Sequence, residues 1–215
     1  MKGLFITFEG LDGSGKSTQL KNIARVLREE GFETVESREP GGTEFAEKIR
    51  SLVLDASLPI TPTTQSLLYF AARSEHVDKL LRPSKEAGKI VLCDRFSDST
   101  LVYQGLAEGK AVEELWDLRQ INSYATENFV PDLTLVFDGR PEKLIERRML
   151  RGVSDRYEDM GLDFQHKLRS GFLALAKLEP HRIKVINAEG TLEEVQREAL
   201  AVIREVIAKE TQDVG

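Results

Sequence analysis

The feature that most constrains the fold of this chain is a glycine-rich loop between an apolar run and a helical pattern near the N-terminus. Residues 10–17 read GLDGSGKS and match every specified position of the phosphate-binding pattern G-x-x-x-x-G-K-[ST]. In this pattern backbone N–H groups point into one concavity, and the start of the following helix adds a positive end. An ordinary glycine-rich turn is the alternative. The match and its flanking strand and helix favour nucleoside triphosphate binding.

Each part of the loop has an expected task. Lys16 reaches the β- and γ-phosphates, and the Ser17 hydroxyl can coordinate Mg²⁺. We expect the triphosphate to contact the loop throughout: Gly10, Leu11, Asp12, Gly13, Ser14, Gly15, Lys16, Ser17 and Thr18.

Short apolar runs alternate with helical patterns along the rest of the chain. The runs typical of buried strands are residues 3–8, 34–37, 90–93, 133–137 and 183–186. Helical patterns cover residues 17–30 and 43–54, a long stretch from Pro62, and a last helix that starts at a capping box, residues 191–194. The alternation predicts an α/β fold of the P-loop NTPase kind, with a parallel sheet of about five strands flanked by helices. No repeat or linker divides residues 1–215, so we expect one domain.

Charge and composition exclude several classes of function. The 215 residues include 30 Lys and Arg against 36 Asp and Glu, a net charge of −6, which argues against a protein that coats nucleic acid. Cys93 is the only cysteine, so an intramolecular disulfide and a cysteine-based metal cluster are both impossible. No apolar run approaches the roughly 18 residues of a membrane span. We expect a cytoplasmic protein that binds neither nucleic acid nor membrane.

Ligands of parallel sheets bind beyond the carboxyl ends of the strands, so the residues that follow the strands are the first candidates for a site. Asp94 follows the run 90–93 and suits the second carboxylate that holds Mg²⁺ through water, beside Ser17. A helix cap or a salt bridge to Arg95 is the alternative for this aspartate.

Arginines and aromatic rings outline a second binding site. Arg38, Arg73 and Arg95 lie at strand ends or on a polar helical stripe, where a planar bidentate donor suits a phosphate or a base edge. Each alone is typical of a solvated surface arginine. Tyr69 and Phe70 precede Arg73 by about one helical turn and provide an aromatic platform for a base. Together they favour a nucleotide as the acceptor.

The long helix from Pro62 carries two stripes. Apolar residues recur at helical spacing at positions 67, 70, 71, 77 and 81. Tyr69, Arg73 and His76 form a second stripe, which lies about half a turn from Leu67 and is aromatic and cationic. His76 is the only histidine that this pattern brings near the expected site.

A further arginine cluster lies between residues 147 and 160. It consists of Arg147, Arg148, Arg151 and Arg156, at the end of one helical pattern and in the glycine-containing stretch after it. One interpretation is a basic helix end that the helix dipole favours. The other is a lid that brings arginine to the transferring phosphoryl group and excludes water. The spacing leaves both interpretations open.

Five segments together resemble the thymidylate kinase family, whose members phosphorylate dTMP. They are FEGLDGSGKST (8–18), REPGGT (38–43), FAARSEH (70–76), DRFSDSTLVYQG (94–105) and PDLTLVFD (131–138). The resemblance covers essentially the whole chain, in order. REPGGT and the 94–105 segment are more discriminating than the phosphate loop, which many unrelated proteins share.

The resemblance implies roles for the matching residues. Asp12 would lie near the dTMP 3′-hydroxyl and phosphate, and Arg95 would grip the acceptor phosphate with Arg38 close by. Arg73 would donate to thymine O4, and either Tyr69 or Phe70 would stack on the ring, with Tyr69 preferred for its i+4 relation to Arg73. The remaining pocket residues would be Thr100, which meets N3, Tyr103, which crowds C2′, and Ser99 and Gln104.

Members of this family differ in where the catalytic arginine lies. Residues 11–14 contain no arginine and the lid segment contains several, so this chain is similar to the bacterial type whose lid supplies it. Arg151 is the first choice, ahead of Arg147 and Arg148, with Arg156 also open. The implied catalytic set is Lys16, Arg95, Arg151 and Asp12.

The resemblance also implies partners and a cofactor. These are ATP as phosphoryl donor, Mg²⁺, dTMP as acceptor, and a second copy of the chain in a homodimer. The alternatives are another nucleoside monophosphate kinase and a regulatory P-loop NTPase that switches a partner, although the latter leaves REPGGT without a purpose.

The lid assignment leads to a first prediction. Arg151→Ala should lower kcat by roughly 10³-fold, the scale of an arginine that stabilises a transferring phosphoryl group. The KM for dTMP should change little, because the interaction is made in the transition state. Steady-state kinetics with ATP and dTMP measure both constants. An unchanged kcat would transfer the role to another arginine of the cluster.

Overall fold

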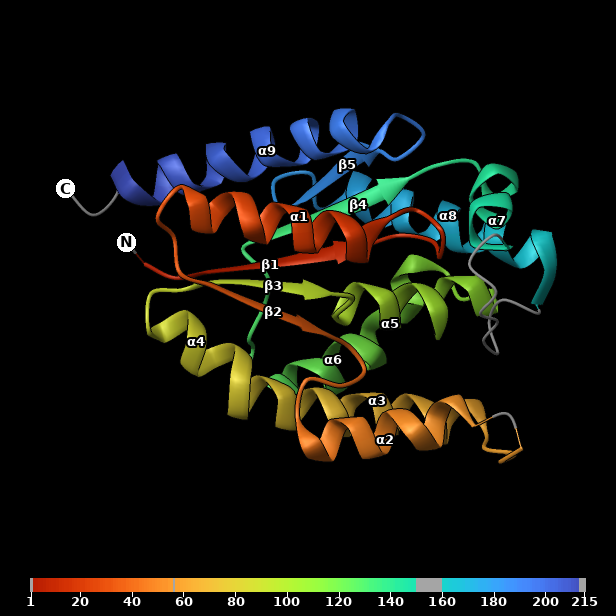
Figure 1. Cartoon of the computed structure of the whole chain (residues 1–215). Helices are drawn as coiled ribbons and strands as arrows, with labels where there is room; N and C mark the ends of the chain where they lie inside the picture. The colour runs from red at the N-terminus through yellow and green to blue at the C-terminus, as the bar shows by residue number, and fades with distance from the viewer. Residues whose placement is uncertain (1, 56, 150–159, 213–215) are drawn as a thin grey trace.

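The computed structural model describes residues 2–55, 57–149 and 160–212. These form a five-stranded parallel sheet in the order β2-β3-β1-β4-β5, with helices on both faces (Figure 1). The strands are β1 (Leu4–Glu9), β2 (Thr34–Arg38), β3 (Ile90–Asp94), β4 (Leu133–Asp138) and β5 (Ile183–Asn187). The five predicted runs agree with these strands to within one residue at each end. The predicted α/β fold class is confirmed.

Helices and helical turns connect the strands. They are α1 (Lys16–Glu29), α2 (Glu44–Leu54), α3 (Pro62–His76), the π-helical turn η1 (Val77–Leu81), α4 (Arg82–Glu86), α5 (Ser97–Tyr103), the 3₁₀ turns η2 (Leu106–Glu108) and η3 (Val112–Leu115), α6 (Trp116–Thr126), α7 (Pro141–Met149), α8 (Gly161–Leu178) and α9 (Leu192–Gln212). The long predicted helix from Pro62 is therefore α3, continued through η1 into α4.

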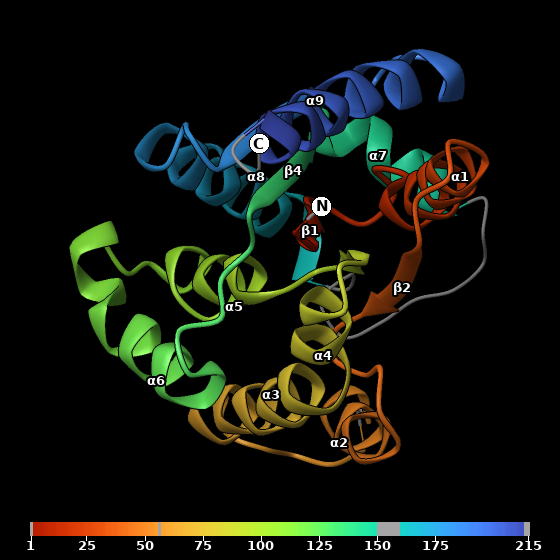
Figure 2. The same cartoon turned by 90° about the vertical axis from the view of Figure 1, so that its left-hand side faces the viewer.

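The helices form layers on either side of the sheet. α1 and α9 pack on one face, where both contact strands and each other, whereas α4 and α8 contact strands on the opposite face and α5 packs on α8. α3 packs between α2 and α6, and these three helices form an outer group beyond the second layer (Figure 2). Among the described residues, no helix is long and apolar enough to span a membrane.

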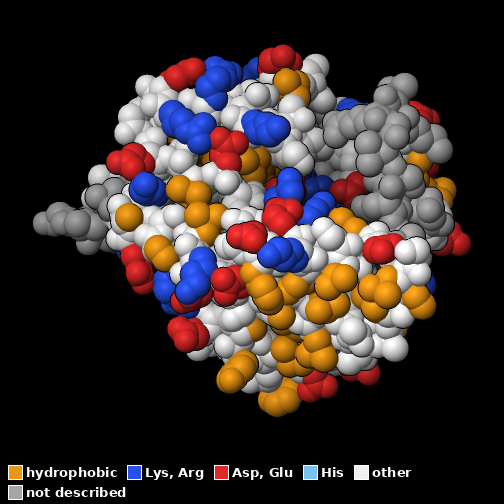
Figure 3. Space-filling view, turned by 60° about the horizontal axis from the view of Figure 1, so that its bottom comes forward, with side chains coloured by type: hydrophobic (Ala, Val, Ile, Leu, Met, Phe, Trp, Pro, Cys, Tyr) orange, Lys and Arg blue, Asp and Glu red, His pale blue; other side chains and the backbone are white. Residues whose placement is uncertain are grey.

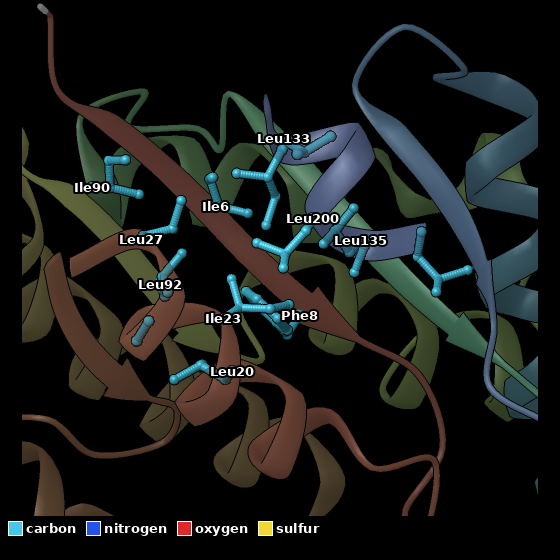
Figure 4. Packing of buried hydrophobic residues seen from close by; sticks show 14 of the residues in the cluster. Ile6, Phe8, Leu20, Ile23, Leu27, Ile90, Leu92, Leu133, Leu135 and Leu200 are labelled. Carbon is cyan, nitrogen blue, oxygen red and sulfur yellow. The ribbon is translucent and has the colours of Figure 1, made fainter. Parts of the chain in front are cut away.

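The central strand β1 explains why the sheet is stable. All six of its residues are buried, because it pairs with β3 on one side and β4 on the other and is covered on both faces. Ile6 and Phe8 point toward Ile23 and Leu27 of α1 and the helix α9 (Figure 4). Since alternate residues of a strand point to opposite faces, Phe5 lies on the other side, where its ring packs 4.9 Å from that of Phe96.

The buried face of α3 is the aromatic and cationic stripe. Tyr69, Arg73 and His76 are all buried, whereas Leu67 is 52% exposed. The apolar spacing is therefore confirmed only in part: Phe70, Val77 and Leu81 are buried, but Leu67 is not. Part of the inner face of α3 lines a polar cavity instead of the apolar core.

The last helix begins as its sequence predicts. The Thr191 hydroxyl accepts a hydrogen bond from the Glu194 N–H, and the Glu194 carboxylate accepts one from the Thr191 N–H. This reciprocal pair is the predicted capping box, which satisfies backbone donors at the start of α9.

Candidate functional site

A cavity of about 350 Å³ opens at the carboxyl edge of the sheet, beyond the ends of β1, β2 and β3. Figure 3 views the side of α2 and α3 and shows basic and acidic side chains meeting near the centre of that face. Most residues expected to bind a nucleotide acceptor line this cavity: Asp12, Arg38, Tyr69, Arg73, Arg95, Ser99, Thr100, Tyr103 and Gln104. Lys16, Ser17 and Asp94 line it as well, so one cavity joins the phosphate loop to the second site.

The phosphate loop follows β1 and has the expected strand and helix on either side. Gly10 has a φ of +126°, and a Cβ at this position would lie 2.5 Å from the Phe137 carbonyl oxygen of β4. Only glycine allows this approach, which lets the chain turn directly beside the sheet. The Ser14 hydroxyl is buried and has no hydrogen-bond partner among the described residues. An unpartnered buried polar group of this kind suits a ligand oxygen.

Lys16 is buried at the bottom of the loop. Its ammonium group donates to the Leu11 carbonyl at 2.8 Å and lies 3.7 Å from an Asp12 oxygen. Burial and the nearby Arg95 charge lower the pKa of Lys16, while Asp12 and Asp94 oppose the shift. A bound phosphate would place further negative charge beside this buried cation.

Ser17 and Asp94 meet across the gap between α1 and β3. The Ser17 hydroxyl donates to Asp94 Oδ2. A hydroxyl and a carboxylate oxygen are the hard ligands that Mg²⁺ prefers together with phosphate oxygens and water. Their contact therefore fits a magnesium site built between the phosphate loop and the end of β3. Among the described residues, no group of three or more His, Cys, Asp or Glu side chains could hold a metal.

Arg95 lies between the phosphate loop and α5. Its guanidinium donates to Asp12 Oδ1 at 2.7 Å and to the Ser99 hydroxyl at 3.1 Å, and it lies over the Tyr103 ring. Burial disfavours its charged form, but Asp12 and the other acidic neighbours hold the pKa of Arg95 above its ordinary value. Its backbone φ is +70°, a left-handed conformation that costs on the order of 1–3 kcal/mol in a non-glycine residue. The strained turn aims a permanently charged guanidinium into the cavity.

Glu9, the last residue of β1, fixes this turn. It is fully buried, and its carboxylate accepts from the Phe96 N–H at 2.7 Å and from the Ser99 hydroxyl at 2.6 Å. Burial and the nearby Asp98 raise the pKa of Glu9 to about 7, although Arg95 opposes the shift. The same strand thus carries the phosphate loop and holds the turn after β3.

Arg73 of α3 reaches the other end of the cavity. Its guanidinium donates to Glu39 Oε2 at 2.7 Å, to the Thr100 hydroxyl at 2.9 Å and to Asn122 Oδ1 at 3.0 Å. The guanidinium also lies 5.0 Å from the centre of the Phe96 ring. These contacts orient the guanidinium along the cavity wall.

The two aromatic candidates have different surroundings. Tyr69 lines the cavity, whereas Phe70 packs in an apolar cluster with residues that include Leu101 and Tyr103. A ligand in the cavity would therefore meet the ring of Tyr69, which lies one helical turn before Arg73.

Arg38, which lines the cavity, and Arg147 are both engaged with other parts of the chain. Arg38 is 55% exposed and pairs with Glu47 of α2 at 3.0 Å. Arg147 donates to the carbonyl oxygens of Ala188 and Glu189, which attaches α7 to the loop after β5. Arg151 and Arg156 lie outside the described residues, as does the side chain of Arg148.

Sequence reasoning did not select several residues of the site. Glu39 and Arg50 line the cavity, Asn122 accepts a hydrogen bond from Arg73, and Glu9 accepts from the cavity residue Ser99. A glutamate in an otherwise apolar strand is a signal that could have indicated Glu9. Asn122 gives no such signal, because its role depends on α6 packing beside α3.

The fold and the site define a P-loop nucleotide-binding protein whose cavity extends from the phosphate loop to Arg73. A family model described as thymidylate kinase matches residues 8–199. The chain therefore belongs to the thymidylate kinase family.

Individual relatives agree with this assignment. The chain is 44% identical to a thymidylate kinase of Symbiobacterium thermophilum over 99% of this chain and 98% of the relative. It is 44% identical to one of Exiguobacterium sibiricum, over 92% of both chains. The crystal structure of a thymidylate kinase from Ehrlichia chaffeensis superposes with a TM-score of 0.76 at 34% identity, covering 95% of this chain and 99% of that chain.

The buried carboxyl group of Glu9 gives a prediction about pH. Its folded-state pKa of about 7 exceeds the ordinary 4.5, so the folded protein binds more protons here than the unfolded protein between these values. The stability contribution is full below about pH 4.5 and is lost as the pH rises through 7. Gln cannot ionise and avoids this loss. Relative to wild type, Glu9→Gln should gain about 3 kcal/mol of unfolding free energy between pH 4.5 and pH 8.

Urea unfolding at several pH values measures this difference. Glu108→Gln, at an exposed position in η2, is the matched control and should show no comparable trend. A Glu9→Gln difference that stays constant with pH would contradict the assignment.

Proposed function

We propose that this chain transfers the γ-phosphoryl group of ATP to dTMP, giving dTDP and ADP, as a step of dTTP biosynthesis. The observation that carries the proposal is the single cavity, which has the phosphate loop at one end and Arg73 with Tyr69 at the other. Its size suits a nucleotide. Membership in the thymidylate kinase family supports the choice of acceptor.

Charge neutralisation is the main task of the phosphate end. The acceptor is a phosphate oxygen, which is already largely anionic at pH 7 because the second phosphate pKa is about 6. No strong general base is needed. Two highly charged groups must approach in line, and Lys16, Arg95 and the loop N–H groups offset their repulsion and stabilise the transition state. Asp12 accepts from Arg95 and orients it for the acceptor phosphate.

Ser17 and Asp94 are the residues that would hold Mg²⁺, Asp94 through water. When bound, the ion supplies charge neutralisation on the phosphate oxygens. The chain's contribution is to keep both oxygen donors together beside the loop.

The base end supplies selectivity. Arg73 would donate to thymine O4, Thr100 would meet N3, and Tyr69 would stack on the ring. Tyr69 has this role rather than Phe70, because Phe70 packs in the apolar cluster. Arg38, Ser99, Tyr103 and Gln104 complete the pocket wall.

The remaining proposals extend the catalytic one. Arg151, at the head of the cluster that includes Arg148 and Arg156, would complete the charge neutralisation as a lid residue. Arg147 is less suited, because its guanidinium is engaged with two backbone carbonyls. The chain would act as one domain, in the cytoplasm.

We further propose that the chain forms a homodimer through the exposed face of α2, α3 and α6. These adjacent helices expose Leu52, Leu67, Trp116 and Tyr124, and the Tyr124 side chain is 90% exposed. Hydrophobic side chains gather on the α2 and α3 side of the molecule (Figure 3). An apolar patch of this kind is typical of an interface between copies.

A panel of acceptors tests the catalytic proposal. With ATP and Mg²⁺, ADP formation should be fastest with dTMP and slower with dUMP. It should be at least 100-fold slower with UMP, whose 2′-hydroxyl would meet Tyr103, and with AMP or GMP, whose purine ring is larger than thymine. A coupled assay for ADP measures these rates. A preference for a purine would identify another nucleoside monophosphate kinase, and slow hydrolysis unaffected by any acceptor would identify a regulatory NTPase.

The dimer proposal leads to a separate prediction. The mass in solution, measured by light scattering, should be twice that of one chain. Leu67→Glu should shift the mass to that of one chain, because it places a charge in an apolar interface. Leu178→Glu, at an exposed position at the end of α8, should leave the dimer intact. A single-chain mass for the unsubstituted protein would contradict the proposal.

A further inference from the structure

A chain of polar side chains runs from the end of β2 to Arg73. The Ser37 hydroxyl lies 2.6 Å from His76 Nε2, His76 Nδ1 lies 3.1 Å from Glu39 Oε1, and Arg73 Nε donates to Glu39 Oε2 at 2.7 Å. Glu39, Arg73 and His76 are respectively 6%, 3% and 0% exposed. None of the reaction's steps requires His76 or Ser37 to touch a substrate, so this row of hydrogen-bonded side chains needs another explanation.

The chemistry of the groups fixes the direction of the contacts. An ionised carboxylate can only accept hydrogen bonds, so His76 Nδ1 carries a hydrogen and donates to Glu39. Each Glu39 oxygen therefore has its own buried donor. Removing either donor would leave a buried carboxylate partly unsatisfied, which is costly.

The loop after β2 keeps His76 in place. Gly42 has a φ of +87°, and a Cβ there would lie 2.3 Å from His76 Nε2 and 2.6 Å from the Ser37 hydroxyl. The backbone of the loop thus lies directly against the imidazole ring. The ring cannot swing out without moving the loop that closes one side of the cavity.

The hydrogen-bonded row of side chains ends at the Arg73 guanidinium, which lines the cavity. An arginine side chain loses about 2 kcal/mol of rotamer entropy when it is fixed in one position. Glu39 fixes the Nε edge, while Thr100 and Asn122 accept from the two terminal nitrogens. The guanidinium is therefore oriented before a base arrives, and preorganisation of this kind increases affinity.

We propose that His76 and Glu39 are positioning residues for base recognition, which hold the Arg73 guanidinium where it donates to a carbonyl oxygen on the base. Selectivity for a base with a carbonyl over one with an amino group at that position then depends on residues that do not contact the base. The inference rests on the proposed function, since it names what sets the selectivity of that site.

Two substitutions of His76 separate the two hydrogen bonds of the ring. In His76→Asn the amide nitrogen takes the place of Nδ1 and can still donate to Glu39. In His76→Gln the amide nitrogen takes the place of Nε2 and contacts Ser37 instead. His76→Gln should raise the KM for dTMP about tenfold, with kcat and the KM for ATP within twofold of wild type. His76→Asn should stay within about threefold for all three constants.

The selectivity between two acceptors is a measurement that a purely structural role of His76 would leave unchanged. The ratio of kcat/KM for dTMP to that for 5-methyl-dCMP, which has an amino group in place of O4, should fall about tenfold in His76→Gln. It should be nearly unchanged in His76→Asn. His181→Gln, at an exposed histidine outside the site, is the matched control and should behave as wild type.

The outcomes distinguish the inference from the function on which it rests. If wild type does not phosphorylate dTMP, the proposed function fails and the inference fails with it. If wild type is active but the Gln and Asn variants behave alike, or both acceptors lose the same factor, the inference alone is overturned. If thermal unfolding measurements show that His76→Gln is not folded, Ser37→Ala decides, since it removes only the contact between Ser37 and His76. It should raise the KM for dTMP two- to threefold, and an unchanged KM would overturn the inference.

Discussion

The pairing of β1 between β3 and β4 is the constraint on which the rest of the structure depends. β1 is buried on both faces, and its carboxyl end is the origin of the phosphate loop. Parallel pairing places the ends of β2 and β3 at the same edge, so loops that are far apart in the chain open into one cavity. The apolar residues of β1 therefore determine the stability of the sheet and the position of the site together.

Three of the cations that line that cavity have acidic partners. Arg95 contacts Asp12, Arg73 contacts Glu39, and Lys16 lies near Asp12. A net charge of −6 is thus compatible with a site for polyanions, because the cations are concentrated at the sheet edge. These acidic residues do not remove the positive charge of the site. They hold long flexible side chains in the positions where phosphates and a base would meet them.

The sequence was most informative where structure is local. The strands and the phosphate loop follow from runs and spacings within a dozen residues, and they are predicted almost to the residue. The stripe of α3 that carries Tyr69 and Arg73 is predicted from its spacing, but the partners that bury it are not, because they come from other parts of the chain. Glu9 acts on residues about 90 positions away, and Arg73 reaches Asn122 across 49 positions. Such partners are defined only once the sheet has formed.

The register of β1 against β3 has a consequence for the distance over which a phosphoryl group must move. Phe8 is aligned with Asp94, so the phosphate loop and the turn that carries Arg95 leave the sheet from adjacent strands at the same level. Neighbouring strands lie about 4.8 Å apart. The separation between the start of the phosphate loop and the turn after β3 is therefore set by backbone hydrogen bonding, the least variable dimension of a sheet.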